Sequence, residues 1–482
     1  MRRLLALAVA VVAAAIVVPG ASAGGPTMIV GAAEDVVRSS DPAVAKAKMT
    51  LLRLAGFDAV RVTSYWQPGL AAPTPEEAQI LQNVDAASQA TGVRVIVQVY
   101  HPGSRTTPLT DQAREEFAQY AGALVSAFPS FREIIIGNEP NLNRFWLPQF
   151  NPDGTGASGP AFFNLLARVY DVVKTVAPDV TVWGGALAPR GADRPNGIRH
   201  TTSPGAFLRD LGAAYRASGR TRPIMDGLAF HPYADSSAQA PDTPHPTSTT
   251  IGLADYDKLI AALGAAFDGT GQTGSTLPIL YDEFGVEAQI PAAKAPLYSG
   301  TEPATVQLVT ERVQAHFYAT AMRLAFCQPN VTGLLLFHTE DERGLTGWQS
   351  GIYYADGTPK TSFWSVRDAM RRVRGGSIGR CSVLFLDVQA NDVRPPTLDE
   401  IRSGEAAVSF SCSLDCSWQV RMLRASGAQA LALRGYGLAG VPVRAELPRK
   451  LGPGPVSFEI TMQSPFNPGT PSVVLTGPVV LR

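Results

Sequence analysis

The chain has 482 residues, and its 41 basic and 41 acidic side chains balance. This length is long for one domain and favours two. Because there is no net charge to attract nucleic acid or an anionic membrane surface, neither is expected as a partner.

The first 23 residues have the pattern of an export signal. Two arginines precede the apolar stretch Leu4–Val18, and Pro19–Ala23 ends in small residues typical of a cleavage site. The stretch is shorter than the ~20 residues that a membrane span needs, and no later apolar run reaches that length. We therefore expect residues 1–23 to be removed and the mature protein, beginning near Gly24, to be secreted without a membrane span.

Four cysteines occur, at Cys327, Cys381, Cys412 and Cys416. In an oxidising compartment they can form two disulfides, with three possible connectivities. A Cys412–Cys416 bridge would be local, and a Cys327–Cys381 bridge would tie the chain near a domain boundary. A metal site is the alternative, although few histidines lie near the C-x-x-x-C segment.

Eight short apolar runs recur over the first three quarters of the chain. Most lack a clean polar–apolar alternation, as expected of parallel strands covered on both faces. They are Thr27–Gly31, Ala59–Val62, Val93–Val99, Glu133–Gly137, Val180–Gly184, Gly227–His231, Pro278–Tyr281 and Thr332–Phe337.

Helical patterns lie between these runs, at Ala78–Ala90, Ala161–Val176, Pro204–Ala217, Leu253–Phe267 and Thr305–Phe326. A capping box, Thr74 to Glu77, precedes the first of them. Eight strand–helix units predict an α/β fold of the (β/α)8 TIM barrel type, with a doubly wound sheet as the alternative.

Four long segments follow predicted strands and should therefore share one rim of the barrel, where a barrel builds its site. They are Pro140–Pro160, Pro232–Thr250, Phe284–Ala304 and Thr339–Pro359. After residue 376 helical patterning stops, and short strand-like runs, the first at Val383–Val388, indicate a smaller all-β sandwich. The predicted domains are the signal at 1–23, the barrel at 24–376 and the accessory sandwich at 377–482.

Two glutamates stand where predicted strands open into loops. Glu139 follows the fourth apolar run and Glu283 follows the seventh. A carboxylate in this position is costly to desolvate unless it has a partner or a chemical task. Strands four and seven lie across a barrel from each other, and two carboxyl groups about 5–5.5 Å apart are what glycoside hydrolysis with retention needs. For either glutamate alone, an ordinary ion pair is the simpler interpretation.

The segment Gly137–Asn141 (Gly-Asn-Glu-Pro-Asn) resembles the strand-four signature of the retaining glycoside hydrolases of clan A, and Tyr281–Gly285 is similar to their strand-seven nucleophile segment. The resemblance covers roughly residues 25–374, with a layout closest to families 5 and 39. It implies Glu139 as a protonated acid/base and Glu283 as an ionised nucleophile, acting by double displacement on a polysaccharide or oligosaccharide without a cofactor.

Four further residues at strand ends fit this resemblance. Arg61 resembles the arginine of the clan's second strand and would keep Glu283 ionised, unless it serves a structural ion pair. Asn138 would donate to the sugar 2-hydroxyl. His231 and Tyr233 could hydrogen-bond the nucleophile or a sugar hydroxyl, although a His-Pro-Tyr segment is often only a packed turn. His101, after the third run, is a weaker candidate of the same kind.

Trp146 and Trp348 are the best candidates for flat sugar-binding surfaces, because both lie in polar, glycine-containing loops. An aromatic residue is nonetheless more often part of a core. The clan usually places a tryptophan at the end of strand eight, where this chain has Phe337, so Trp348 could take that place. The identity of the sugar stays open.

Two other classes of function remain. One is a carbohydrate-binding or adhesion protein on an inactive barrel, with the two carboxylates far apart or turned away. The other is a metal-dependent hydrolase using His101, His231 and His338, but the first apolar run lacks the histidines that such sites often carry, so no metal is expected. The expected partner is a carbohydrate, and the protein is expected to be a monomer.

Overall fold

The computed structural model of the protein describes residues 25–196, 200–376, 381, 390–412, 416–437, 441–449, 452–464 and 467–481. The expected export signal and the predicted strand Val383–Val388 lie outside these residues.

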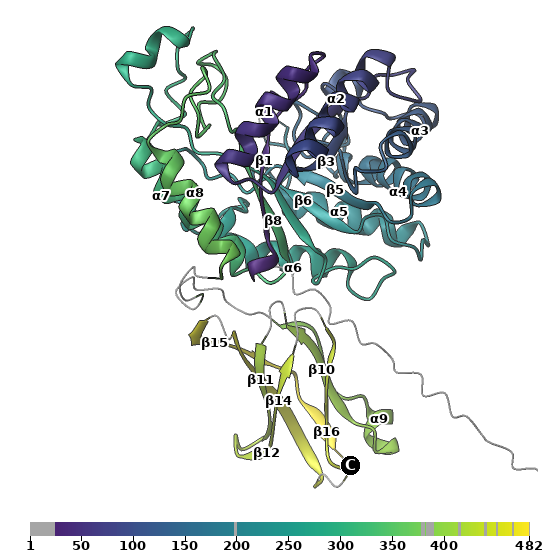
Figure 1. Cartoon of the computed structure of the whole chain (residues 1–482). Coiled ribbons are helices and arrows are strands. Elements are labelled where there is room, and N and C mark those ends of the chain that lie inside the picture. Colours follow the sequence, from purple (N-terminus) through teal and green to yellow (C-terminus); the bar gives the residue numbers. More distant parts are fainter. Residues whose placement is uncertain are drawn as a thin grey trace, which may run out of the picture.

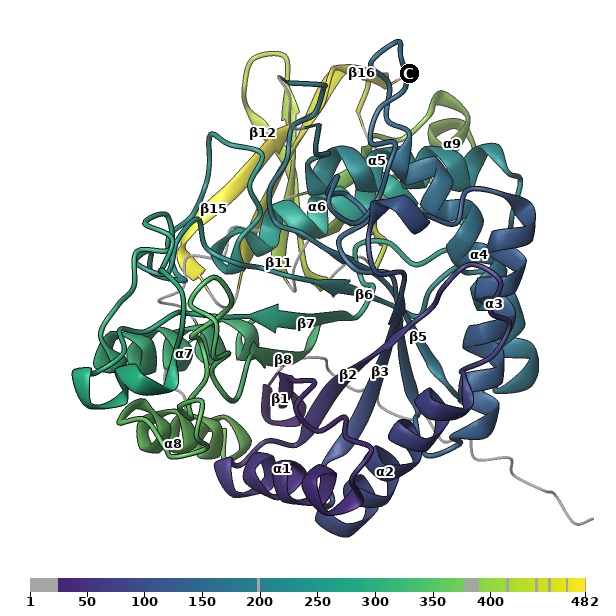
Figure 2. The same cartoon turned by 90° about the horizontal axis from the view of Figure 1, so that it is seen from above.

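Eight parallel strands close into a barrel in sequence order, and Figure 2 shows them inside a ring of helices. Each predicted apolar run forms one strand, so the barrel prediction is confirmed and the doubly wound sheet was the wrong alternative. The strands are β1 (Ile29–Ala33), β2 (Ala59–Tyr65), β3 (Arg94–Tyr100), β4 (Glu133–Ile136), β5 (Thr181–Leu187), β6 (Gly227–Phe230), β7 (Ile279–Phe284) and β8 (Val331–Phe337).

The helices that surround the barrel are α1 (Pro42–Ala55), α2 (Pro75–Thr91), α3 (Asp111–Ala127), α4 (Ser158–Val176), α5 (Pro204–Ala217), α6 (Tyr256–Phe267), α7 (Glu311–Phe326) and α8 (Ser362–Arg374). Thr74 caps α2 by accepting a hydrogen bond from the Glu77 backbone, but the Glu77 carboxylate pairs with Arg38 at 2.6 Å. Helix α7 begins later than predicted, because Thr310 is its N-cap.

The C-terminal part of the chain forms antiparallel sheets, as its all-β pattern predicts. One sheet has the order β13-β10-β9, and the other has the order β12-β11-β14-β15 with β16 beside β14. Phe410 of β10 and Trp418 of β11 bring the two sheets into contact, with ring centroids 5.7 Å apart. The elements are β9 (Ala390–Arg394), α9 (Leu398–Ser403), β10 (Ala407–Cys412), β11 (Cys416–Arg424), β12 (Gln429–Gly437), β13 (Val443–Glu446), β14 (Gly454–Ser464), β15 (Asn467–Leu475) and β16 (Val479–Leu481).

These sheets lie at the end of the barrel where α8 finishes (Figure 1). Helix α8 starts from the loop after β8 and runs back along the barrel, so its C-terminal end is opposite the rim that carries the strand-end loops. Contacts between α6 and β9 join the two parts. The sheets therefore contact the barrel at the end away from the candidate site.

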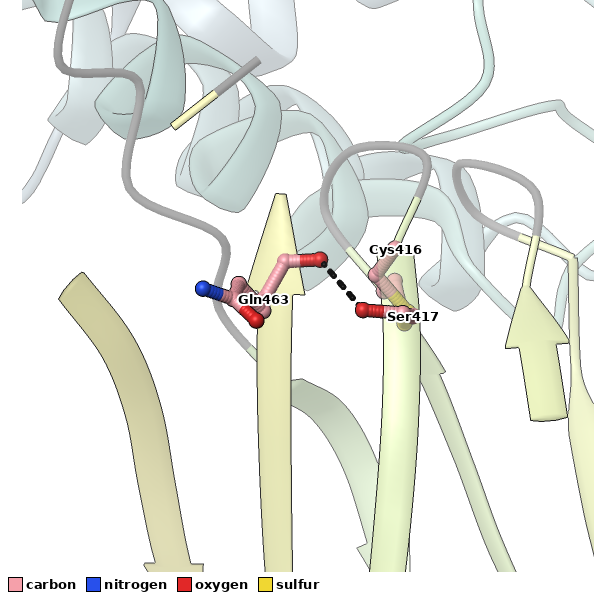
Figure 3. The surroundings of a disulfide bond; sticks show 4 residues. Cys416, Ser417 and Gln463 are labelled. Carbon is pink, nitrogen blue, oxygen red and sulfur yellow. Dashed lines mark hydrogen bonds between the residues drawn. A yellow bond between two sulfur atoms is a disulfide. The ribbon is translucent and has the colours of Figure 1, made fainter. Parts of the chain in front are cut away.

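Both cysteine pairs are joined as disulfides. Cys327 bonds Cys381, and Cys412 bonds Cys416, with sequence separations of 54 and 4 residues. The second bond links β10 to β11, and next to it Ser417 donates a hydrogen bond to the Gln463 carbonyl of β14 at 3.3 Å (Figure 3). The prediction of two disulfides is confirmed, and the structure selects one of the three possible connectivities. The metal alternative for these cysteines was wrong because all four sulfurs are in disulfides.

Among the helices that the structure describes, none combines the length and the apolar character needed to cross a membrane.

Candidate active site

The turn after β4 presents Glu139. Gly137 and Glu139 both have positive φ angles, 93° and 43°, and a Cβ on Gly137 would lie 2.9 Å from the Phe162 ring. The Glu139 backbone donates to the Ala186 carbonyl at 2.8 Å, which ties the turn to β5. A non-glycine residue in the left-handed region costs about 1–3 kcal/mol and is characteristic of functional sites. The turn therefore requires glycine at position 137, whereas Glu139 takes a strained backbone conformation that the turn itself does not need.

Strand β7 places two adjacent carboxylates at the centre of the barrel end. In a regular strand, neighbouring side chains point to opposite faces. Here the pairing of β7 with β8 is irregular between Tyr281 and Phe284, and both Asp282 and Glu283 reach the same arginine. The irregularity explains how both acids face one site.

Arg61 of β2 is that arginine. Its guanidinium lies 2.7 Å from Glu283 Oε1 and 3.2 Å from Asp282 Oδ2, and only 6% of it is exposed. Burial lowers the pKa of Arg61, but Glu283 and Asp282 outweigh burial and raise it above its ordinary value. For Asp282 the effects are reversed. Burial raises its pKa, but His231 and Arg61 together hold the pKa of Asp282 below its usual value.

His231, directly after β6, lies between the carboxylates and is fully buried. Its Nδ1 is 3.1 Å from Glu139 Oε1 and 3.5 Å from Glu283 Oε2, and its Nε2 is 3.2 Å from Asp282 Oδ2. Burial alone lowers the pKa of His231, but Glu283, Asp282 and the hydrogen bonds raise it to about 10. The ring is therefore a cation at neutral pH that donates to the acids around it.

The shared imidazole nitrogen limits how far apart the two glutamates can be. Glu139 Oε1 and Glu283 Oε2 are separated by at most 6.6 Å, the sum of their distances of 3.1 and 3.5 Å to His231 Nδ1. This limit admits the ~5–5.5 Å of retaining glycosidases and overlaps only the lower edge of the ~6.5–9.5 Å of inverting ones. One oxygen of each carboxylate therefore lies close to the same imidazole nitrogen.

Tyr233 and Trp348 complete one wall of the site. The Tyr233 hydroxyl donates to Glu283 Oε2 at 2.9 Å, and burial together with Glu283 raises the pKa of Tyr233 well above its ordinary value. The half-buried Trp348 ring lies 5.1 Å from the Tyr233 ring and 5.3 Å from Phe337, centroid to centroid. The loop after β8 thus returns a tryptophan to the end of the strand, where Phe337 stands.

Asn138 is held at the edge of the site by β3. Gln98 Nε2 donates to Asn138 Oδ1 at 3.2 Å and to the Gly137 carbonyl at 2.9 Å. This contact fixes the orientation of the Asn138 amide, so that its nitrogen is left to donate to another group.

His101 and Trp146 are placed differently from the other candidates. Their rings pack together with centroids 5.6 Å apart, and Trp146 also packs on Phe162 of α4. Trp146 is only 1% exposed, so the structure does not offer its face to a sugar. Burial lowers the pKa of His101 to about 4, opposed by its hydrogen bond to the Gly103 carbonyl, so this ring is neutral. Trp146 packs on the apolar surface of α4, and His101 packs on Trp146. The pair therefore supports the loop after β4 and does not contact the carboxylates.

The three strand-end histidines do not come together. His231 lies among the carboxylates, His101 packs on Trp146, and His338 is 3.0 Å from the Ala33 carbonyl. In the part of the chain that the structure describes, no group of three or more His, Cys, Asp or Glu residues is arranged to hold a metal ion.

Three site residues were missed in the sequence. Asp282 stands beside Glu283, but a regular strand would turn it away. Gln98 is a polar residue within an otherwise apolar strand, and this pattern in the sequence could have identified it as a candidate. Glu287 lines a cavity next to Tyr233 only because the strand-end loops fold together at the rim.

No protein-family model matches the sequence, and no curated protein sequence does. The structure is similar to the GH5_18 protein of Streptomyces cattleya in complex with GlcNAc, with a TM-score of 0.50 at 17% identity, over 73% of this chain and 81% of that one. At this identity the likeness shows the barrel fold.

Two other solved structures are similar at lower scores. The exo-β-1,4-mannosidase of Opitutaceae bacterium strain TAV5 has a TM-score of 0.44 at 16% identity, over 73% of this chain and 60% of that one. A Bacteroides uniformis β-glucuronidase has a TM-score of 0.46 at 12% identity, over 95% of this chain. This chain spans about half the length of that enzyme, 47%.

Proposed function

We propose that this protein is a secreted retaining glycoside hydrolase of the clan A type, with Glu139 as acid/base and Glu283 as nucleophile. The observation that carries the proposal is the convergence of both carboxylates on His231, with Arg61 and Tyr233 on the two oxygens of Glu283. The barrel fold, shared with a GH5_18 protein, supports it. The proposed catalytic domain is 24–376, followed by an accessory domain at 377–482.

The reaction proceeds in two displacements. Glu283 attacks the anomeric carbon while Glu139 gives its proton to the departing glycosidic oxygen, so that a glycosyl ester forms and the leaving group departs as an alcohol. Water then attacks the same carbon, gives a proton to Glu139 and releases Glu283. Two inversions at one carbon give net retention.

The residues around the acids have distinct parts in these steps. Arg61 and Tyr233 hold the two oxygens of Glu283 in place, which reduces the reorganisation needed for attack. The cationic His231 donates to Glu139 Oε1, which leaves Oε2 to face the glycosidic oxygen. Asn138 would donate to the 2-hydroxyl of the sugar, a contact that strengthens in the transition state.

The proposal is tested with a screen of nitrophenyl glycosides and of plant and microbial polysaccharides. On the substrate that the wild type hydrolyses, Glu283→Ala and Glu139→Gln should each reduce kcat by at least 10³-fold, as expected when a group that acts only in the transition state is removed. Glu115→Gln, at a surface pair with Arg168, should leave kcat unchanged.

Proton NMR of the first product formed should show the anomer of the substrate. Formation of the opposite anomer would overturn the retaining mechanism, and near-normal turnover by either active-site variant would overturn the assignment of these two residues.

A further inference from the structure

A cavity of about 320 Å³ opens beside the proposed catalytic centre. Its lining comes from the loops after β5, β6, β7 and β8, and includes Tyr233, Ser237, Gly285, Glu287, Val306 and Trp348. Tyr233 forms its border with the catalytic centre, because the same side chain donates to Glu283. The volume is in the lower part of the range of small-molecule sites and is sufficient for one sugar unit.

Glu287 is the polar group that this cavity presents without a full set of partners. It is 5% exposed, and its Oε2 accepts a hydrogen bond from the Gln349 backbone at 3.1 Å. Within the described residues no group donates to its Oε1. This oxygen therefore keeps lone pairs that a ligand in the cavity can use as a hydrogen-bond acceptor.

The charges around the cavity are predominantly negative. Arg190 at its mouth is already paired with Asp235 at 3.2 Å, and Lys360 is paired with Asp341 at 2.8 Å. Burial first, and then the nearby Glu302, Asp341 and Glu342, raise the pKa of Glu287 to about 7, although the Gln349 backbone opposes this rise. The buried oxygens of Glu302 also have no hydrogen-bond partner in the part of the chain that the structure describes.

Two aromatic rings supply the apolar surface. Tyr233 and Trp348 both line the cavity, and the Trp348 ring is half-buried. A sugar ring presents C–H groups on its faces and hydroxyls on its edges, so an aromatic wall and a carboxyl acceptor together match one sugar unit.

We propose that this cavity is a second sugar-binding subsite, which holds a neighbouring sugar unit through a hydroxyl or amino group that donates to Glu287 and which disfavours a uronic acid. The inference rests on the proposed function, since it extends the same substrate beyond the sugar at Glu283. The exclusion of a uronic acid follows from the acidic groups around Glu287, namely Glu302, Asp341 and Glu342, which would repel a further carboxylate in the cavity.

Binding is measured by saturation-transfer NMR with methyl β-glucosaminide, methyl β-glucoside and methyl β-glucuronide at pH 7. The wild type should bind the first two at least fivefold more tightly than the glucuronide. The ammonium group of the glucosaminide favours the ionised form of Glu287, and Glu287→Gln replaces this carboxylate by a neutral amide, so the variant should bind the glucosaminide about tenfold more weakly.

Thr305→Trp provides an independent variant, because Thr305 lines the cavity from an exposed position and a larger ring there reduces the space for a ligand while Glu287 itself is unchanged. It should abolish the preference for the first two ligands, whereas Glu115→Gln should bind as the wild type does. Failure of all three sugars to bind, equal binding of the glucuronide, or unchanged affinities in both cavity variants would each overturn the subsite.

This assay requires no turnover. Normal hydrolysis by the Glu139 and Glu283 variants would overturn the proposed function and leave the binding result standing, while a lack of dependence on Glu287 would overturn the subsite alone.

Discussion

Two cationic side chains offset the negative charge of the acids in the proposed catalytic centre. Glu139, Asp282 and Glu283 surround His231, and Arg61 supplies a second cation. Because the pKa of His231 rises from 6.5 to about 10, its ionisation stabilises the folded protein fully below pH 6.5 and loses this effect as the pH rises through about 10. The imidazolium therefore persists across the neutral range and keeps the buried acids paired.

Replacing Tyr233 by phenylalanine tests its role on the nucleophile. Tyr233→Phe removes the 2.9 Å hydrogen bond to Glu283 Oε2 but keeps the ring that packs on Trp348. A hydrogen bond to a charged group is worth about 1.5–3 kcal/mol, so kcat should fall roughly 10- to 100-fold with little change in KM. Steady-state kinetics with the screened substrate provide the measurement.

The matched control is Tyr215→Phe. In the wild type, the Tyr215 hydroxyl donates to the Arg222 carbonyl at 3.0 Å, in the segment that follows α5. It should retain wild-type kcat. An equal loss of kcat in both variants would show a general effect of losing a buried phenol and would contradict the role given to Tyr233.

Glu287 should make stability depend on pH. Its pKa is about 7 in the folded protein against an ordinary value of 4.5, so the folded state binds the proton more tightly than the unfolded state does. Stability contributed by this group is therefore present below pH 4.5 and is lost as the pH rises through about 7. The charged groups that face Glu287 are Glu302, Asp341, Glu342 and Lys360.

Glu287→Gln cannot titrate, so the difference in Tm between the variant and the wild type should become more positive from pH 5 to pH 8. Thermal unfolding followed by circular dichroism measures it, with Glu115→Gln as the control for loss of a carboxylate. A difference that stays constant or changes in the opposite direction would contradict the burial of an ionisable Glu287.

At the scale of elements, close helix packing holds the barrel wall next to the C-terminal sheets. Gly212 of α5 lies against α6, and a Cβ on it would be 2.5 Å from the Ala266 carbonyl oxygen. Gly205 near the start of the same helix has no heavy atom within 4 Å of the equivalent position. One helix thus offers a crowded glycine and an open one.

Gly212→Ala should destabilise the protein by about 1–2 kcal/mol, since an overpacking cost of about 1–3 kcal/mol exceeds the ~0.5–1 kcal/mol gained from a better helix former. Gly205→Ala should be neutral or stabilising by up to about 1 kcal/mol. Urea unfolding followed by tryptophan fluorescence compares the two, and equal free energies of unfolding would contradict the close approach of α5 and α6.

Whole-molecule stability should depend more on one disulfide than on the other. The Cys327–Cys381 loop spans 54 residues and starts at the end of α7, whereas Cys412–Cys416 spans 4. Loop-closure entropy gives about 4 kcal/mol for the first loop and about 2 kcal/mol for the second.

Cys327→Ser with Cys381→Ser should therefore lower the free energy of unfolding more than Cys412→Ser with Cys416→Ser does. Urea unfolding of both double variants provides the measurement. A larger loss for the short loop would show that local geometry in the C-terminal sheets outweighs chain entropy.

Local sequence patterns were sufficient to predict the eight-strand barrel, the all-β C-terminal part and the two strand-end glutamates. Hydrophobic periodicity and turn residues are local properties of the chain, so β4, β7 and the glutamates near their C-terminal ends could be recognised without knowledge of their neighbours. The predicted start of helix α7 was too early, because no residue between Thr305 and Thr310 clearly marks that segment as lying outside the helix.

Only the tertiary structure decided which neighbours join those glutamates. Asp282 faces the site because β7 is irregular, Trp146 is buried because α4 lies beneath its loop, and Trp348 returns to Phe337. The cavity at Glu287 exists where four loops from different parts of the sequence meet at one rim. Such contacts depend on the packing of distant segments, and no local pattern in the chain encodes them.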